Sequence, residues 1–217
     1  PNVCEAMEQM IDDGITEVIV QPTHILDGIE NHIMKDEVLS YKSCFQSISF
    51  GAPLLSGQKD AETIVHAIGK RFEYLDKNTA LVLMGHGTAH QANAVYEELG
   101  QLFKDMGYPH IFLGTVESSP SVQELIQEIS NYGISSRNCD SADNDLPVEK
   151  VVLAPFMIVA GDHAHNDMAG EHPESWTSRF QNAGYEAESV LKGLGAYQKI
   201  RELFVEHVQN AINNINE

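Results

Sequence analysis

Basic residues are scarce in this sequence. Thirteen lysines and arginines stand against 32 aspartates and glutamates in 217 residues, a formal net charge of −19. Proteins that bind nucleic acid need a positive surface, so this balance argues against a nucleic-acid partner. A negative field attracts cations and is compatible with a metal-handling role, although solubility alone is the simpler explanation of the charge.

Cysteine and long apolar runs are scarce as well. Cys4, Cys44 and Cys139 are odd in number, widely spaced and in no CxxC pattern, which favours reduced thiols in the cytoplasm over a disulfide framework. No apolar run approaches the roughly 20 residues needed to span a bilayer, so we expect no membrane partner. The chain opens on PNVCEAMEQM, without an initiator Met or a signal-like segment. An exported form with a removed leader therefore stays open.

Three signatures of nucleotide and hydrolase chemistry are missing from the sequence. Without GxxxxGK[ST] there is no cradle for a nucleotide triphosphate, so we expect no ATP-driven step. GHGTAH is not a dinucleotide motif, because His90 stands where GxGxxG has its third glycine. The lack of a GxSxG elbow disfavours an α/β-hydrolase triad. We therefore expect no nucleotide cofactor.

The sequence does contain a regular alternation of helical and strand patterns. Strand-like apolar segments occupy residues 16–21, 44–51, 80–85, 110–117, 148–161 and, more weakly, 186–193. Amphipathic helical patterns occupy residues 3–14, 29–42, 61–75, 91–106, 121–133 and 196–213. Continuous apolar strands separated by helices predict an α/β fold whose parallel sheet is covered on both faces.

The domain organisation follows the same alternation. We expect two α/β halves, residues 1–77 and 78–217, with the last helix packing back on the first half. The segment SSRNCDSADNDLP (135–147) breaks the rhythm, because it is polar, rich in aspartate and without periodicity. It predicts an exposed acidic loop.

Histidines and carboxylates follow four of the predicted strands, and in open parallel sheets ligands bind outside the carboxyl ends of the strands. The residues are His24 and Glu30, His86 and His90, Glu117, and Asp162, His163, His165 and Asp167. Imidazole and carboxylate suit Co²⁺, Fe²⁺, Ni²⁺ or Zn²⁺, and no thiol lies among them. The sequence therefore predicts a metal site of His86, Glu117 and His163. The two histidines could alternatively act as acid–base groups.

Glycines adjoin both histidines and would leave room for a flat ligand or a close backbone approach; they are Gly85, Gly87 and Gly161. A single histidine after a strand is more often a loop residue without a function. For His90 and His165 we favour a helix-start role, and Asp162 either orients His163 or caps a helix. Five other histidines are expected to be structural: His32, His66, His110, His172 and His207.

Four motifs together resemble the anaerobic cobaltochelatases of cobalamin biosynthesis, the CbiK type of class II, ATP-independent chelatase: QPTHILDGIE, LVLMGHGTAHQANAVY, GTVESSP and APFMIVAGDHAHNDMAG. The likeness covers nearly the whole chain. It implies two Rossmann-like halves with a cleft between them, and insertion of Co²⁺ into sirohydrochlorin. The SFGTS strand and the helix with which members normally begin are absent, so we expect an incomplete N-terminal half.

The resemblance also implies roles for individual residues. It carries the two family histidines onto His86 and His163, as metal ligands and catalytic groups. Its metal-site glutamate falls on Glu117, and a second cleft glutamate falls on Glu30, a candidate proton relay. Gly85, Gly87 and Gly161 would then lie against the tetrapyrrole.

Several alternatives stay open at this stage. A ferrochelatase acting on sirohydrochlorin or a porphyrin would use similar residues, and Fe²⁺ or Ni²⁺ could replace Co²⁺ because such ligands do not fix the metal. A non-catalytic haem- or metal-binding protein could also use this scaffold, with His24 as the candidate haem ligand. Whether the chain forms a homo-oligomer is left open.

Overall fold

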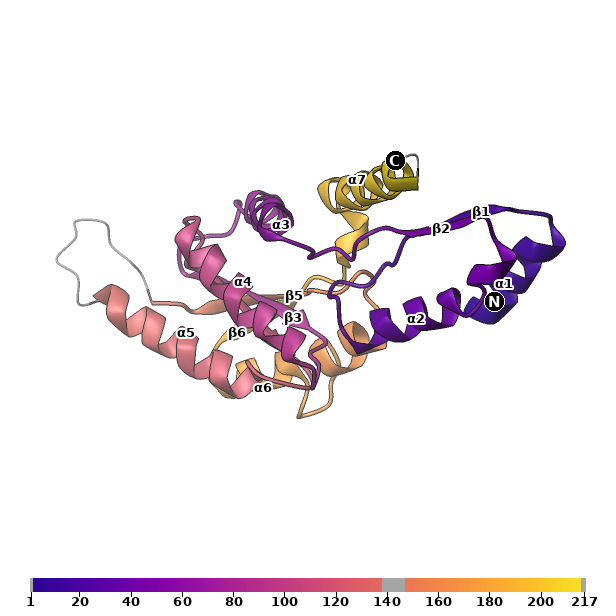
Figure 1. Ribbon diagram of the computed structural model, residues 1–217. Coiled ribbons are helices and arrows are strands. Elements are labelled where there is room, and N and C mark those ends of the chain that lie inside the picture. The colour runs from indigo at the N-terminus through magenta and orange to yellow at the C-terminus, as the bar shows by residue number, and fades with distance from the viewer. Residues whose placement is uncertain (1, 138–146, 216–217) are drawn as a thin grey trace. The chain divides into compact units, whose positions relative to one another are not determined.

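The computed structural model describes residues 2–137 and 147–215 (Figure 1). Most of the predicted acidic loop, residues 138–146, lies outside the described residues. Among the helices that the structure describes, none combines the length and the apolar character needed to cross a membrane.

The chain divides into two compact units. The first comprises Pro1–Asp60 and Gln198–Glu217, and the second comprises Ala61–Tyr197. The boundary between the units therefore lies after residue 60, and the last segment of the chain belongs to the first unit. The halves 1–77 and 78–217 stay a prediction about the family architecture.

The first unit is built around a small parallel sheet. Its elements are α1 (Val3–Asp12), β1 (Glu17–Val20), α2 (Ile29–Leu39), β2 (Ser47–Phe50) and α7 (Gln198–Ile215). The two strands pair in parallel, with Val18 beside Ile48. The terminal helix α7 contacts both strands, and Ser49 Oγ donates a hydrogen bond to the Ala211 carbonyl at 3.0 Å.

The second unit contains a four-stranded, entirely parallel sheet in the order β4-β3-β5-β6. Its main elements are α3 (Gln58–Arg71), β3 (Thr79–Gly85), α4 (Ala94–Asp105), β4 (Ile111–Thr115), α5 (Val122–Arg137), β5 (Lys150–Pro155), α6 (Trp176–Asn182) and β6 (Glu186–Ser189). The predicted parallel α/β class is confirmed. The strand order reverses at β3, which has β4 on one side and β5 on the other. The carboxyl ends of β3 and β5 therefore form the switch point at which such sheets bind ligands.

Strand β3 is the centre of this sheet, and all seven of its residues are buried. Ala80, Val82 and Met84 belong to a core that also holds Leu125 of α5 and Phe180 of α6, and these helices lie on one side of the strands in Figure 1. Fully burying an apolar side chain contributes about 1.5–3 kcal/mol. An apolar run covered on both faces is what the sequence of β3 predicts.

Three local predictions were wrong. Helix α5 continues past Gly133 to Arg137, because a glycine inside a helix costs only about 1 kcal/mol and does not end it. Strand β5 ends at Pro155, not at residue 161. The carbonyls of Met157 and Ile158 accept hydrogen bonds from the 194–195 backbone at 2.7 and 2.9 Å instead of joining the sheet. Helix α6 was missed because seven residues are too few to show helical periodicity.

Candidate metal centre

His86 and Glu117 are held in register by an extension of the sheet. His86 follows the last residue of β3, and Glu117 comes two residues after β4. The Val116 N–H donates to the Gly85 carbonyl at 3.0 Å, and the Glu117 N–H donates to the His86 carbonyl at 2.9 Å. The strand ladder thus continues past both strands and places the two side chains on one edge of the sheet.

His163 begins η3 (His163–Met168), a short π-helix that follows β5. Such single π turns occur frequently at functional sites. Ala164 and Met168 are both fully buried in the core of the second unit. These two residues anchor the turn, while His163 itself stays partly exposed.

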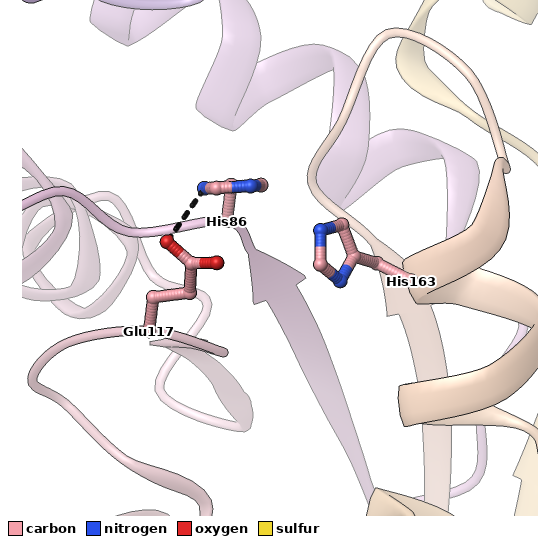
Figure 2. Close-up of side chains that lie close together, drawn as sticks. All are labelled: His86, Glu117 and His163. Carbon is pink, nitrogen blue, oxygen red and sulfur yellow. Dashed lines mark ion pairs between the residues drawn. The ribbon is translucent and has the colours of Figure 1, made fainter.

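The three predicted ligands come together (Figure 2). One ligand atom of each of His86, Glu117 and His163 lies within 4.8 Å of the others, and they form the one such group found among the described residues. His86 Nδ1 lies 3.7 Å from Glu117 Oε2. The imidazole rings are 4.7 Å apart between centroids and nearly perpendicular, at 87°. Two imidazoles and a carboxylate at this spacing can converge on one divalent cation.

The hydrogen bonds of the two imidazoles fix where their protons lie. His163 Nδ1 is 2.6 Å from Asp167 Oδ2, and His86 Nδ1 is 3.0 Å from the Gly87 carbonyl. Carboxylate and carbonyl oxygens only accept hydrogen bonds, so we assign the proton to Nδ1 in both rings. In the neutral ring, the Nε2 atom of His163 then carries the lone pair that can bind a metal.

The sequence did not anticipate the side chain that links the two loops carrying His86 and Glu117. Asn93 accepts a hydrogen bond from the Thr88 N–H at 3.0 Å and donates one to the Ser119 carbonyl at 2.7 Å. The amide thus joins the loop after β3 to the loop after β4. No sequence pattern pairs these two loops, and only their meeting at one sheet edge reveals the role of Asn93.

Gly85 is explained by packing inside the protein. A Cβ atom at this position would lie 2.4 Å from Tyr96 Cε1, because the ring of this α4 residue covers the end of β3. Tyr96 is buried, and burial raises the pKa of its hydroxyl, while hydrogen bonds with the Gly87 and His86 backbone act in the opposite direction. A contact of Gly85 with substrate stays a prediction.

Gly87 and Gly161 differ in their surroundings. Gly87 has a φ of +87°, and its Cβ would lie 2.9 Å from Thr115 Cβ. A Cβ on Gly161 would meet only Val159 Cγ2, at 3.8 Å. Gly87 is therefore required by the turn that presents His86, whereas Gly161 leaves space beside His163. Their contacts with a tetrapyrrole stay predictions.

The group of His86, Glu117 and His163 does not include His90, Asp162 or His165. His90 caps the short 3₁₀ turn η2 (Gln91–Asn93), because its Nδ1 accepts a hydrogen bond from the Ala92 N–H at 3.1 Å. Asp162 precedes η3 and makes no side-chain cap bond. The carboxylate that bonds His163 is Asp167, four residues on. His165 is exposed on the same turn.

His24 and Glu30 belong to the first compact unit. Glu30 is exposed in the first turn of α2, where a carboxylate interacts favourably with the helix dipole. His24 is partly buried, and among the described residues its Nδ1 has no hydrogen-bond partner. The roles of Glu30 as a relay and of His24 as a haem ligand stay predictions.

Comparison with known proteins identifies the family. The model of the cobalt chelatase (CbiK) family matches residues 2–213. The sirohydrochlorin cobaltochelatase of Salmonella typhimurium is 34% identical over 209 residues, which cover 96% of this chain and 74% of that protein. The sirohydrochlorin cobaltochelatase CbiKC of Nitratidesulfovibrio vulgaris is 31% identical over 219 residues, which cover 100% of this chain and 72% of that protein.

Solved structures share the fold. SirB from Bacillus subtilis with Fe³⁺ matches with a TM-score of 0.65 and 15% identity, over 100% of this chain and 80% of that one. The sirohydrochlorin chelatase SirB of Bacillus subtilis subspecies spizizenii in complex with cobalt matches with a TM-score of 0.64 and 17% identity, over 99% and 77%. The resemblance carried by the four sequence motifs is confirmed: the chain belongs to the cobalt chelatase (CbiK) family.

Proposed function

We propose that this protein inserts Co²⁺ into sirohydrochlorin without a nucleotide, and that His86, Glu117 and His163 hold the metal before transfer. Family membership supports the reaction. The observation that supports the site is the convergence of these three side chains within 4.8 Å at the switch point of the parallel sheet.

The exposure of the three side chains suits a metal that must be taken up and passed on. His86, Glu117 and His163 expose 48%, 56% and 36% of their side chains. Three protein ligands leave coordination positions open for water or for an incoming nitrogen atom of the macrocycle. Transfer can then proceed by stepwise exchange of protein ligands for macrocycle nitrogens, driven by the new metal–nitrogen bonds.

Metallation also requires a proton acceptor, because the macrocycle loses its pyrrole N–H protons as the metal enters. An imidazole nitrogen released by the departing metal accepts a proton near neutral pH. His86 and His163 are placed for this second role, since each ring frees a nitrogen when the metal leaves. Glu30 remains a proposed proton relay.

An exposed valine four residues before His163 suits the apolar ring face of a tetrapyrrole. Val159 is 68% exposed, yet its backbone is closely packed: a Cβ on Gly193 would lie 2.6 Å from Val159 Cα. The exposed side chain is therefore held on a fixed backbone, four residues before His163. We assign to Val159 an apolar contact with the face or edge of the tetrapyrrole.

Direct metallation tests this function. Purified full-length protein is incubated anaerobically with sirohydrochlorin and Co²⁺, and the absorbance change of the macrocycle is compared with the spontaneous rate. Parallel reactions with Fe²⁺ and Ni²⁺ measure metal preference. We expect His86→Ala and His163→Ala to fall to the spontaneous rate and His165→Ala, on the same turn as His163, to keep the parent rate. Parent-like rates in both ligand variants would refute the site.

A further inference from the structure

We propose that Asp167 is a positioning residue that sets the tautomer and orientation of His163. This inference rests on the proposed role of His163 as a metal ligand. The inference is based on the 2.6 Å contact between Asp167 Oδ2 and His163 Nδ1, which is a short, charge-assisted hydrogen bond.

The carboxylate of Asp167 is carried by an anchored segment. The neighbouring Met168 is fully buried, and its carbonyl accepts a hydrogen bond from Thr177 Oγ1 at 2.8 Å. The Ala169 N–H closes the π turn on the Ala164 carbonyl at 3.1 Å. Both ends of the Asp167 segment are thus fixed to the core, so the carboxylate can hold the His163 ring in one direction.

The hydrogen bond selects one tautomer of His163. Asp167 can only accept, so the proton stays on Nδ1 and the Nε2 lone pair stays available for the metal. Carboxylates that hold a ligating histidine in this way fix its orientation, and their loss typically weakens metal binding by about 10–100-fold. His86 differs, because its Nδ1 bonds a neutral backbone carbonyl, that of Gly87. Loss of Asp167 should therefore remove the hydrogen bond of His163 Nδ1 and leave that of His86 Nδ1 in place.

The chain supplies a matched control one residue before His163. Asp162 carries the same charge, is exposed, and makes no side-chain cap bond at the start of η3. Asp162→Ala and Asp167→Ala change the net charge equally, within four residues of His163. A difference between them cannot come from the general electrostatic field.

The test measures Co²⁺ affinity by titration without tetrapyrrole and the His163 tautomer by ¹⁵N NMR of the metal-free protein. We expect Asp167→Ala to weaken Co²⁺ binding by about 10–100-fold and to shift the His163 ring nitrogens toward a tautomer mixture, while the His86 signals stay unchanged. Asp167→Glu should restore part of the affinity, and Asp162→Ala should match the parent.

The proposal is overturned if Asp167→Ala binds Co²⁺ as tightly as the parent, or if its His163 nitrogen signals are those of the parent. Should Asp167→Ala not fold, Asp167→Leu, which is similar in shape and cannot form the hydrogen bond, supplies the same two readouts. Both readouts are independent of metallation. If the parent protein fails to metallate sirohydrochlorin while Asp167→Ala still shows the affinity loss and the tautomer shift, the proposed function is refuted and the role of Asp167 stands.

Discussion

Replacing Gly87 with alanine should damage both stability and metal binding. Its φ of +87° lies in the left-handed region, where an L side chain costs about 1–2 kcal/mol. The new Cβ would lie 2.9 Å from Thr115 Cβ and 3.0 Å from Thr115 Oγ1. Thr115 is 1% exposed at the end of β4. Relieving the clash therefore requires the packed Thr115 side chain or the backbone of the turn to shift, which typically costs about 1–3 kcal/mol. We expect the free energy of unfolding to fall by about 2–5 kcal/mol.

The metal affinity should change together with the stability. The Gly87 carbonyl accepts the hydrogen bond from His86 Nδ1, so a displaced turn also turns the imidazole. Denaturant unfolding and Co²⁺ titration of Gly87→Ala measure the two effects. Gly100→Ala is the control, because Gly100 lies inside α4 with no atom within 4 Å of its Cβ position. It should gain about 0.5–1 kcal/mol and keep the parent affinity. A Gly87→Ala protein within about 0.5 kcal/mol of the parent would refute the reasoning.

Three further predictions concern other parts of the molecule. Asn93→Ala removes the bridge between the two ligand loops, so the Co²⁺ affinity should fall several-fold; an unchanged affinity would show that the bridge is dispensable. His207→Leu removes the imidazole whose Nε2 lies 3.3 Å from the carboxylate of Asp60, which is 8% exposed and keeps its hydrogen bonds from Ser56. The midpoint of denaturant unfolding should report a loss of about 1–3 kcal/mol with unchanged Co²⁺ affinity, and a loss below about 0.5 kcal/mol would contradict a stabilising contact between His207 and Asp60. Val159→Thr, which replaces a methyl group with a hydroxyl and adds no charge, should raise KM for sirohydrochlorin without changing Co²⁺ affinity, and an unchanged KM would exclude the proposed apolar contact.

The convergence of the three candidate ligands could be predicted because their positions follow from backbone topology. Parallel strands bring their carboxyl ends to one edge, so residues that follow β3, β4 and β5 must meet there. His86, Glu117 and His163 are such residues, and they do meet. Buried strands such as β3 were predictable for a related reason, because an unbroken apolar run needs cover on both faces.

The supporting side chains could not be predicted in the same way. The partnership of Asp167 with His163 requires a π turn after β5, whereas the sequence had pointed to Asp162 as the residue that orients His163 or caps a helix. The bridge by Asn93 requires two loops that are adjacent only in the folded chain. Tyr96 shows the same limit, because its contact with Gly85 depends on how α4 packs against β3. These contacts depend on tertiary geometry that local patterns do not encode.

The most direct test of the metal centre is to locate Co²⁺ by anomalous diffraction from crystals of the full chain grown with the metal. The account predicts a peak bonded to His86, Glu117 and His163 at about 2.0–2.2 Å from a nitrogen or oxygen atom of each. The peak should disappear in crystals of His163→Ala. A fully occupied Co²⁺ peak elsewhere, with none at these three side chains, would contradict the central claim.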